Sequence, residues 1–203
     1  QICLPDVWRV CGLLGQQQDQ WSAPSHDKRP SGSYEGPSRL GEGLQETPPG
    51  EVLLRVLVDT NVVLDVLLDR KPFAQAAAQV FALVEESRIE GFLCATTVTT
   101  VDYLLGQALA PEEARATLKR LLDMFEIAPV NRPVLEQAFG SNISDFEDAV
   151  LEQSARLVSV DSITTRNLTD FQKSSVPACD PQELLSAVEA MESANQAMDS
   201  DEE

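Results

Sequence analysis

Short runs of apolar residues alternate with longer stretches of helical spacing from about residue 51 onward. The first run, over residues 52–58, is almost continuously apolar and ends in Asp59. A strand that is buried on both faces of a parallel sheet has this pattern. Four more short runs predict strands, at residues 92–95, 127–130, 162–165 and 176–179. The last run contains Pro177 and is therefore expected at an edge of the sheet.

Helical spacing fills the segments between these runs. Gly91 is expected to end the second helix, because glycine is common just past a helix. Ser144 and Glu147 match a capping box at one helix start, and so do Asp180 and Glu183 at the last. The predicted helices cover residues 61–68, 72–90, 96–107, 133–139 and 145–157, and two more begin at residues 111 and 181. Strands alternating with helices predict an α/β fold, a three-layer α/β/α sandwich with a central parallel sheet.

Composition divides the chain into three parts. Residues 1–50 hold seven of the ten glycines, six of the twelve prolines and both tryptophans, whereas all seven phenylalanines lie beyond them. Residues 1–50 are therefore expected to be a disordered extension, or a spurious one translated upstream of the true start, and both alternatives stay open. Residues 51–191 form the predicted folded domain. Residues 192–203 contain five acidic and no basic residues and are expected to be a disordered tail.

Several kinds of site are excluded by what the predicted domain lacks. The only histidine is His26, so no Ser-His-Asp, Cys-His or histidine-bound zinc site is available within residues 51–191. No glycine motif for phosphate or dinucleotide binding occurs. The four cysteines form no C-x-x-C pair, which favours a reducing, cytoplasmic location. No apolar stretch is long enough to span a membrane.

Aspartates at strand ends and helix starts remain as the candidate catalytic or metal-binding residues. The net charge of -18 offers no general attraction to nucleic acid, so any such binding must be local. Asp59, Asp148 and Asp170 fall at such positions, and in open α/β sheets the chemistry lies beyond the carboxyl ends of the strands. Carboxylate oxygens suit Mg²⁺ or Mn²⁺. Clustered carboxylates that hold these ions are typical of phosphodiester hydrolysis.

Residues 54–185 resemble a PIN-domain ribonuclease of the VapC toxin type. Three segments carry the resemblance: Val-Leu-Val-Asp59-Thr-Asn61 with Asp65 and Arg70-Lys-Pro-Phe73, Asp145-Phe-Glu-Asp148-Ala-Val with Ala155, and Thr165-Arg-Asn167-Leu-Thr-Asp170-Phe171. The resemblance implies a PIN-like fold, Mg²⁺ or Mn²⁺ as cofactor, and cleavage of single-stranded regions of RNA. It also implies the toxin of a toxin–antitoxin pair, with a cognate antitoxin as partner and a homodimer as its assembly.

The resemblance also assigns roles to individual residues. Asp59 matches the first family acid and Asp148 the third, so both are expected to bind the metal and to take part in catalysis. Asn167 and Asp170 share the fourth position. Asn167 can offer a neutral carbonyl oxygen to the metal, and Asp170 can reach the ion directly or through water.

The second family acid has no clear match in this chain. It is expected in the helix that begins at residue 96, and the best register places Thr100 there, with Asp102 two residues further on. Either Asp102 substitutes through a shifted register or the site works with a hydroxyl, and both alternatives stay open. The same gap supports an alternative function, a catalytically weakened PIN-fold module that binds RNA or protein.

Further residues are expected around the metal site rather than on the metal. Asn61 is expected to cap and orient the turn after Asp59, and Asp65 to lie next to the site or on the surface. Asp145 suits the positive end of a helix dipole. Arg166 and Arg70 are expected to hold phosphate oxygens of the RNA.

Overall fold

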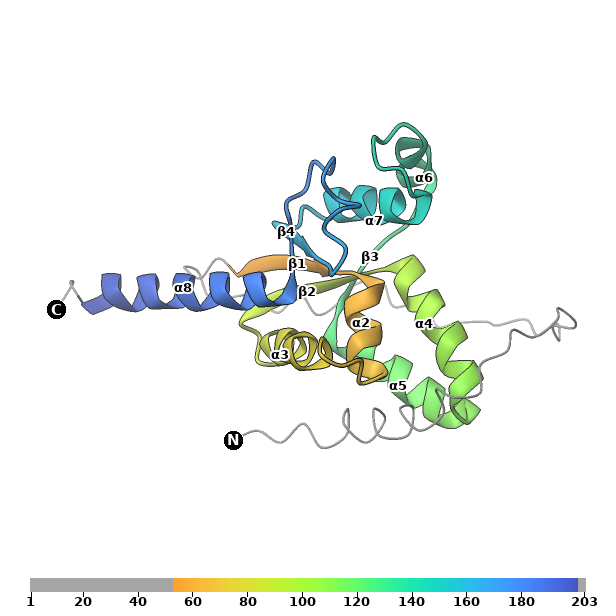
Figure 1. The fold of residues 1–203 in the computed structure, drawn as a ribbon, viewed down its shortest axis with the longest axis horizontal. Helices are drawn as coiled ribbons and strands as arrows, with labels where there is room; N and C mark the ends of the chain where they lie inside the picture. Colours follow the sequence, from red (N-terminus) through yellow and green to blue (C-terminus); the bar gives the residue numbers. More distant parts are fainter. Residues whose placement is uncertain (1–52, 201–203) are drawn as a thin grey trace, which may run out of the picture.

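A five-stranded parallel sheet forms the centre of the described residues (Figure 1). The structure, a computed structural model, describes residues 53–200, with side chains up to residue 197. The strand order is β3-β2-β1-β4-β5, and every neighbouring pair is parallel. The strands are β1 (Leu54–Val58), β2 (Ile89–Cys94), β3 (Glu126–Ala128), β4 (Ser162–Thr164) and β5 (Ala178–Cys179). The position of β5 at an edge agrees with the expectation from Pro177.

Helices cover both faces of this sheet, which confirms the predicted three-layer α/β/α sandwich. Figure 1 shows α6 and α7 side by side on one face, and α2, α3, α4 and α5 on the other. The α8 helix packs against α3 and then extends away from the body. The helices of the described part are α2 (Thr60–Leu67), α3 (Ala74–Glu85), α4 (Ala95–Ala108), α5 (Pro111–Met124), α6 (Arg132–Phe139), α7 (Phe146–Leu157) and α8 (Pro181–Ser200).

The middle strand β1 is apolar on both sides because both of its faces are covered. Val56, Leu57 and Val58 are completely buried. Successive side chains of a strand point to opposite faces, so Val56 and Val58 lie in the core shared with α2, α3, α4 and α5. Leu57 lies in the second core, under α6 and α7. The run without polar alternation thus fits a central parallel strand.

The second strand begins earlier than the sequence predicts. β2 starts at Ile89 and contains Gly91, so the prediction that Gly91 ends a helix is wrong. A Cβ atom at Gly91 would lie 2.6 Å from Cγ2 of Val84 and 2.8 Å from Cδ1 of Phe125. Glycine occupies this position because α3 and the end of α5 approach the strand closely.

Gly91→Ala should lower the free energy of unfolding by about 2 kcal/mol, a common cost of overpacking a core. The added methyl group has no room beside the branched Val84 side chain and the Phe125 ring. Urea unfolding of both proteins measures the change. Gly106→Ala in α4 is the matched control: its Cβ would meet nothing within 4 Å, so it should be neutral or stabilising. Equal stability of wild type and Gly91→Ala would contradict this account of β2.

Capping aspartates begin two of the helices. Asp145 is the N-cap of α7, and its Oδ1 accepts hydrogen bonds from two backbone N–H groups of the first turn, at 2.8 Å and 3.3 Å. The capping box predicted from Ser144 is therefore wrong by one residue. The prediction for α8 is confirmed: Asp180 Oδ1 accepts from the Glu183 N–H at 2.9 Å, and Glu183 Oε2 accepts from the Asp180 N–H at 3.0 Å.

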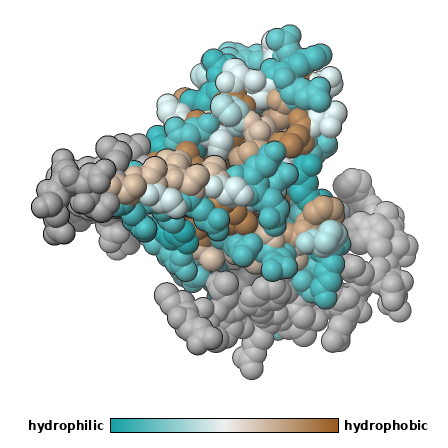
Figure 2. Space-filling view, turned by 60° about the vertical axis from the view of Figure 1, so that its left-hand side comes forward, coloured by the Kyte–Doolittle hydropathy of each residue, from teal (hydrophilic) through white to brown (hydrophobic). Residues whose placement is uncertain are grey.

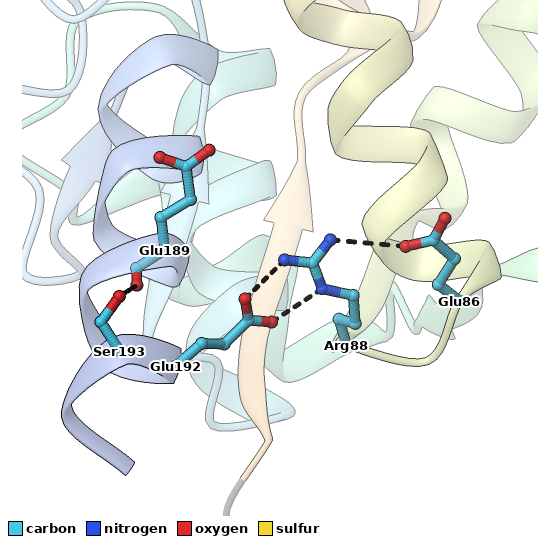
Figure 3. A network of polar contacts seen from close by, with 5 residues as sticks. All are labelled: Glu86, Arg88, Glu189, Glu192 and Ser193. Carbon is cyan, nitrogen blue, oxygen red and sulfur yellow. Dashed lines mark hydrogen bonds and ion pairs between the residues drawn. The ribbon is translucent and has the colours of Figure 1, made fainter. Parts of the chain in front are cut away.

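An arginine connects the middle of α8 to the body of the molecule. Figure 3 shows Arg88, in the turn before β2, between Glu86 and Glu192. Its Nε and Nη2 donate to the two carboxylate oxygens of Glu192 at 2.7 Å and 2.6 Å. All three side chains are partly exposed, so the contribution to stability is modest.

The helix α8 extends further than its composition suggests. It continues to Ser200, so residues 192–200, which the sequence assigns to a disordered tail, are helical. The predicted extension over residues 1–50 and residues 201–203 lie outside the described residues. In Figure 2, hydrophilic residues cover most of the visible side, and a paler strip follows α8 at the left. Within residues 53–200, no helix is both long and apolar enough to cross a membrane.

Candidate active site

Asp59 lies at the carboxyl end of the central strand β1, at the N-cap position of α2. Its side chain is 6% exposed. It forms no capping hydrogen bond with α2, so helix capping does not explain an aspartate here. Burial raises the pKa of Asp59, while the hydrogen bond from Thr165 and the nearby backbone N–H groups of Thr60 and Asn61 lower it in part.

A small network of hydrogen bonds fixes the Asp59 carboxylate. Its Oδ2 accepts from Thr165 Oγ1 at 2.7 Å and from Asn61 Nδ2 at 2.5 Å. Thr165 Oγ1 also accepts from Asn61 Nδ2 and from the Asn167 N–H, both at 3.0 Å. Asn61 Oδ1 accepts from the Arg166 N–H at 3.2 Å. The network connects the start of α2 to the loop after β4. Asn61 therefore orients this turn, but its expected capping role is wrong, because it lies inside α2 and the N-cap position is Asp59.

Thr165 is a site residue that the sequence analysis did not single out. It is completely buried, and its hydroxyl uses its one donor and both acceptors within the network. The available signal was its position directly after β4, the neighbour of β1 in the sheet. Parallel strands bring their carboxyl ends to one edge, and that brings Thr165 to Asp59.

Asp148 lies in the first turn of α7 and is partly buried. Burial and then the negative charges of Asp59, Asp145, Asp170 and Glu147 raise the pKa of Asp148 to about 7. These residues come from the end of β1, the start of α7 and the loop after β4. The fold therefore brings the three aspartates predicted from the sequence, at positions 59, 148 and 170, into one electrostatic cluster.

Glu147 belongs to this cluster although the sequence analysis used it only for capping. Its charge raises the pKa of both Asp59 and Asp148. The side chain itself is exposed. Its neighbour Asp145 acts in two ways, since it caps α7 and adds negative charge near Asp148. The sequence signal for Glu147 was its place beside Asp148 in the same helical turn.

The raised pKa of Asp148 predicts an unusual dependence of stability on pH. Without divalent ions, the free energy of unfolding should fall as pH rises from about 4 to about 7, because folded Asp148 keeps a proton that the unfolded chain has lost. Added Mg²⁺ should raise the melting temperature more at pH 8 than at pH 5, since the cation needs the deprotonated carboxylate. Thermal unfolding at both pH values, with and without MgCl₂, measures these effects.

Asp148→Asn is the control for this pH dependence. It cannot titrate, so its stability should fall less between pH 5 and pH 8, and Mg²⁺ should stabilise it less. The same pH and Mg²⁺ response in the variant and in the wild type would show that Asp148 is not the responsible group.

Asn167 and Asp170 form the exposed edge of the cluster. The Asn167 Nδ2 donates to Asp170 Oδ2, and the Asp170 N–H donates to the Asn167 carbonyl oxygen at 3.2 Å. Both side chains are exposed. The turn therefore holds one amide and one carboxylate together, and Asp170 is close enough to act on Asp148.

The two candidates for the missing second acid, Thr100 and Asp102, lie on different sides of helix α4. Thr97 of α4 is buried, and its Oγ1 lies 2.9 Å from Oγ1 of Thr60, the residue after Asp59. Thr100 is about 60° from Thr97 around the helix, whereas Asp102 is about 140° away. Thr100 is partly buried and Asp102 is exposed. The structure thus favours a hydroxyl at this position over a carboxylate from Asp102.

Arg166 is engaged with a buried carboxylate and an aromatic ring, and its expected contact with an RNA phosphate stays a prediction. Its Nε is 2.8 Å from Asp65 Oδ2, and its guanidinium lies over the Phe73 ring at 4.4 Å. The pair is an ionic contact without hydrogen-bond geometry, since the Asp65 oxygens and Arg166 Nε form no hydrogen bond. Burial raises the pKa of Asp65, and Arg166 and Arg70 lower it. Asp65 is fully buried, so its expected surface alternative is wrong.

Glu152 in α7 connects two loops that lead to the site. Its carboxylate is 3% exposed. One oxygen accepts from the Ser175 N–H at 2.7 Å, from Ser175 Oγ at 2.8 Å and from Ser174 Oγ at 3.3 Å. The other accepts from Gln153 Nε2 at 2.9 Å and Ser141 Oγ at 3.4 Å. Sequence analysis missed this residue, because nothing in its position marks a helical glutamate as buried.

The donor set of the cluster suits a hard divalent cation. Carboxylate oxygens of Asp59, Asp148 and Asp170, with the amide oxygen of Asn167, are the ligand types that Mg²⁺ and Mn²⁺ prefer. The half-buried negative charge around Asp148 also calls for a counter-ion. Within residues 53–200, however, no three His, Cys, Asp or Glu side chains are close enough to surround an ion. The types of these residues therefore fit a divalent cation, although their carboxylates do not surround a single point in this structure.

Comparison with known proteins agrees with this architecture. Residues 55–169 match the family described as PIN domain. This match covers more than half of the chain. The chain belongs to the PIN-domain family. The matched residues of this PIN domain include Asp59 and Asp148, whereas Asp170 lies one residue beyond the match.

Solved structures resemble this PIN domain at low sequence identity. The structure of FitAB bound to an IR36 DNA fragment has 20% identity and a TM-score of 0.50, and covers 62% of this chain and 94% of that chain. FitAcB from Neisseria gonorrhoeae has 22% identity and a TM-score of 0.49, covering 63% and 98%. VapC20 from Mycobacterium tuberculosis has 16% identity and a TM-score of 0.47, covering 60% and 98%. The FitAB likeness indicates the fold alone. No curated protein matches the chain significantly.

Proposed function

We propose that this PIN domain is a divalent-metal-dependent endoribonuclease that cleaves single-stranded regions of RNA. The observation that carries the proposal is that Asp148, at the start of α7, lies close enough to Asp59, Glu147 and Asp170 for their negative charges to raise its pKa. Membership of the PIN-domain family supports it. Such a concentration of negative charge destabilises the fold, and binding a cation offsets that cost.

Asp59 and Asp148 are the proposed metal ligands, with Asp170 or Asn167 completing the set. When bound, Mg²⁺ or Mn²⁺ would neutralise the cluster and polarise the scissile phosphodiester and a water molecule. Thr165 and Asn61 hold the Asp59 carboxylate in one orientation. Burial of Asp59 beneath the site keeps its charge poorly hydrated, so its interaction with a cation is strengthened.

The proposed biological role is that of a toxin with a cognate antitoxin, active as a homodimer. It rests on the family membership and on the resemblance of the three motifs around Asp59, Asp148 and Asn167 to VapC-type sequences. Co-expression with a small partner encoded beside this chain should relieve growth inhibition by the wild type. Growth that is unaffected by the wild type would contradict the toxin role.

Cleavage of a structured RNA by the purified chain tests the enzymatic proposal. With Mn²⁺ or Mg²⁺, the chain should cut the single-stranded loops and leave the duplex stems intact, and EDTA should stop the reaction. Cleavage that continues in EDTA would contradict the metal dependence.

A weakened PIN-fold module that binds RNA or protein is the second candidate. The partly buried Thr100 on the side of α4 nearest the site, in place of an acid, favours it. The same experiment distinguishes the two: RNA binding without cleavage, at every Mn²⁺ concentration, supports the binding module.

A further inference from the structure

Two exposed phenylalanines on the surface pack against each other. Phe139 ends α6 and is 79% exposed, and Phe146 begins α7 and is 44% exposed. Their ring centroids are 4.7 Å apart, and the ring planes are inclined by 34°. Four other phenylalanines are buried in the two cores, Phe81, Phe92, Phe125 and Phe171, whereas Phe73 is 44% exposed and lies under the Arg166 guanidinium. An exposed pair of rings adds no buried apolar area to the fold of this domain, and exposed apolar patches of this kind mark binding surfaces.

The aromatic pair lies beside the acidic cluster. Phe146 stands between Asp145 and Glu147 in the first turn of α7, and Asp148 follows two residues later. Residues two apart in a helix have Cα atoms about 5.4 Å apart. The α6 and α7 helices lie side by side (Figure 1), and the two rings are in contact between them. Side chains two positions apart in a helix point to nearly opposite sides, so a single strand that contacts both the rings and Asp148 has to pass around the start of α7.

Electrostatics favour an uncharged contact at this surface. The nearby carboxylates repel phosphate groups, and two basic residues of this part of the protein have acidic partners. Arg132 of α6 pairs with Glu136 at 2.9 Å, and Arg166 pairs with Asp65. Stacking of a base on an aromatic ring needs no positive charge and accepts every base. An acidic protein can hold a single strand in this way without a basic groove.

We propose that the Phe139–Phe146 pair stacks an unpaired base of the RNA next to the acidic cluster. This inference rests on the proposed function, because it takes single-stranded RNA as the ligand. Phe139, the more exposed ring, provides the stacking surface, and Phe146 supports it from α7. The pair would position a strand whose backbone phosphate lies at the carboxylates. Duplex RNA, with its bases already stacked, would gain nothing from it.

The test measures RNA binding separately from cleavage. Full-length Asp59→Asn protein, which is expected to be inactive, is titrated with a labelled single-stranded RNA and with the same strand lacking one base. Adding Phe139→Leu should weaken binding of the intact strand on the order of tenfold and bring its affinity to that of the abasic strand. Phe139→Tyr, which keeps a ring, should bind like the parent. Leu157→Ala, an exposed apolar change at the far end of α7, is the control and should also bind like the parent.

The outcomes separate this inference from the proposed function. If wild-type protein cleaves RNA and Phe139→Leu changes neither the KM nor the binding, the stacking inference is overturned while the nuclease stands. If wild-type protein binds RNA without cleaving it, the nuclease proposal fails and the binding series still decides on Phe139. Sedimentation of Phe139→Leu as a monomer where the wild type is a dimer, with unchanged RNA binding, would assign the pair to an interface between copies. An absence of RNA binding by the wild type contradicts both proposals.

Discussion

Replacing Asp59 by asparagine should reduce RNA cleavage by at least about 100-fold, the scale expected for loss of one charge-stabilising group. The buried carboxylate of Asp59 is the proposed metal ligand with the most defined orientation. Asparagine has nearly the same shape, and its carbonyl oxygen can still accept from Thr165 and Asn61. The fold should survive, so the loss will report on the charge. Single-turnover cleavage at saturating Mn²⁺ measures it.

Stability provides a second readout for the same variant. Asp59→Asn removes one negative charge from the neighbourhood of Asp148 and Glu147. Without divalent ions the variant should therefore melt at the same or a higher temperature than the wild type. Asp102→Asn, the same chemical change on the exposed side of α4, should leave both cleavage and melting unchanged. Full cleavage by Asp59→Asn, or an equal loss in Asp102→Asn, would refute the assignment of Asp59 to the metal.

Glu152→Ala should lower the free energy of unfolding by about 3 kcal/mol, because five hydrogen bonds end on this buried carboxylate. Removing it leaves several donors without their acceptor inside the protein. Ser141 and Ser174 belong to the loops that lead to Asp148 and away from Asp170, so cleavage should also fall. Urea unfolding at pH 7.5, followed by a cleavage assay on the folded fraction, measures the two effects.

Two further variants test whether the loss of stability in Glu152→Ala comes from its buried hydrogen bonds. Glu152→Gln keeps the volume and one carbonyl oxygen, so its loss should be smaller than that of the alanine variant. Glu136→Ala, an exposed position on α6 with one surface ion pair, should stay within about 0.5 kcal/mol of the wild type. If Glu152→Ala is as stable as Glu136→Ala, the two loops are held by other contacts.

The site differs from the resemblance that predicted it in one respect. A second acid is expected from the helix after β2, and the structure places Thr100 on that side of α4 with Asp102 facing solvent. Negative charge instead accumulates from the start of α7, through Asp145, Glu147 and Asp148. The experiments on Asp59 and on metal-dependent cleavage decide whether this arrangement supports catalysis.

The predictions of helix and strand bounds were wrong where contacts that the sequence pattern does not show select the structure. Gly91 follows a helical stretch, but its strand geometry follows from its contact with Val84 and Phe125. Ser144 and Asp145 are both good caps, and the hydrogen bonds of the first turn of α7 select Asp145. Composition could not show that residues 192–200 continue a helix whose first turns are anchored in the core.

The fold class and a candidate acid at a strand end can be predicted from the sequence. A continuous apolar run ending in Asp59 requires a strand covered on both faces, and strand ends in a parallel sheet share one edge. The alternation of strands and helices follows from periodic patterns and the edge position of β5 from Pro177, whereas the grouping of Asp59, Asp148 and Asp170 is an expectation from the resemblance to PIN-domain sequences. Periodicity is a property of neighbouring residues, so it can be read without the fold.

Tertiary packing sets the partners of the polar side chains. It joins Asp59 to Thr165, pairs Arg166 with Asp65, and buries Glu152 between two loops. These contacts connect residues far apart in the chain, and their energies depend on burial and on the charges nearby. A residue type in the sequence specifies what a side chain can bind; packing specifies whether that group still faces a ligand.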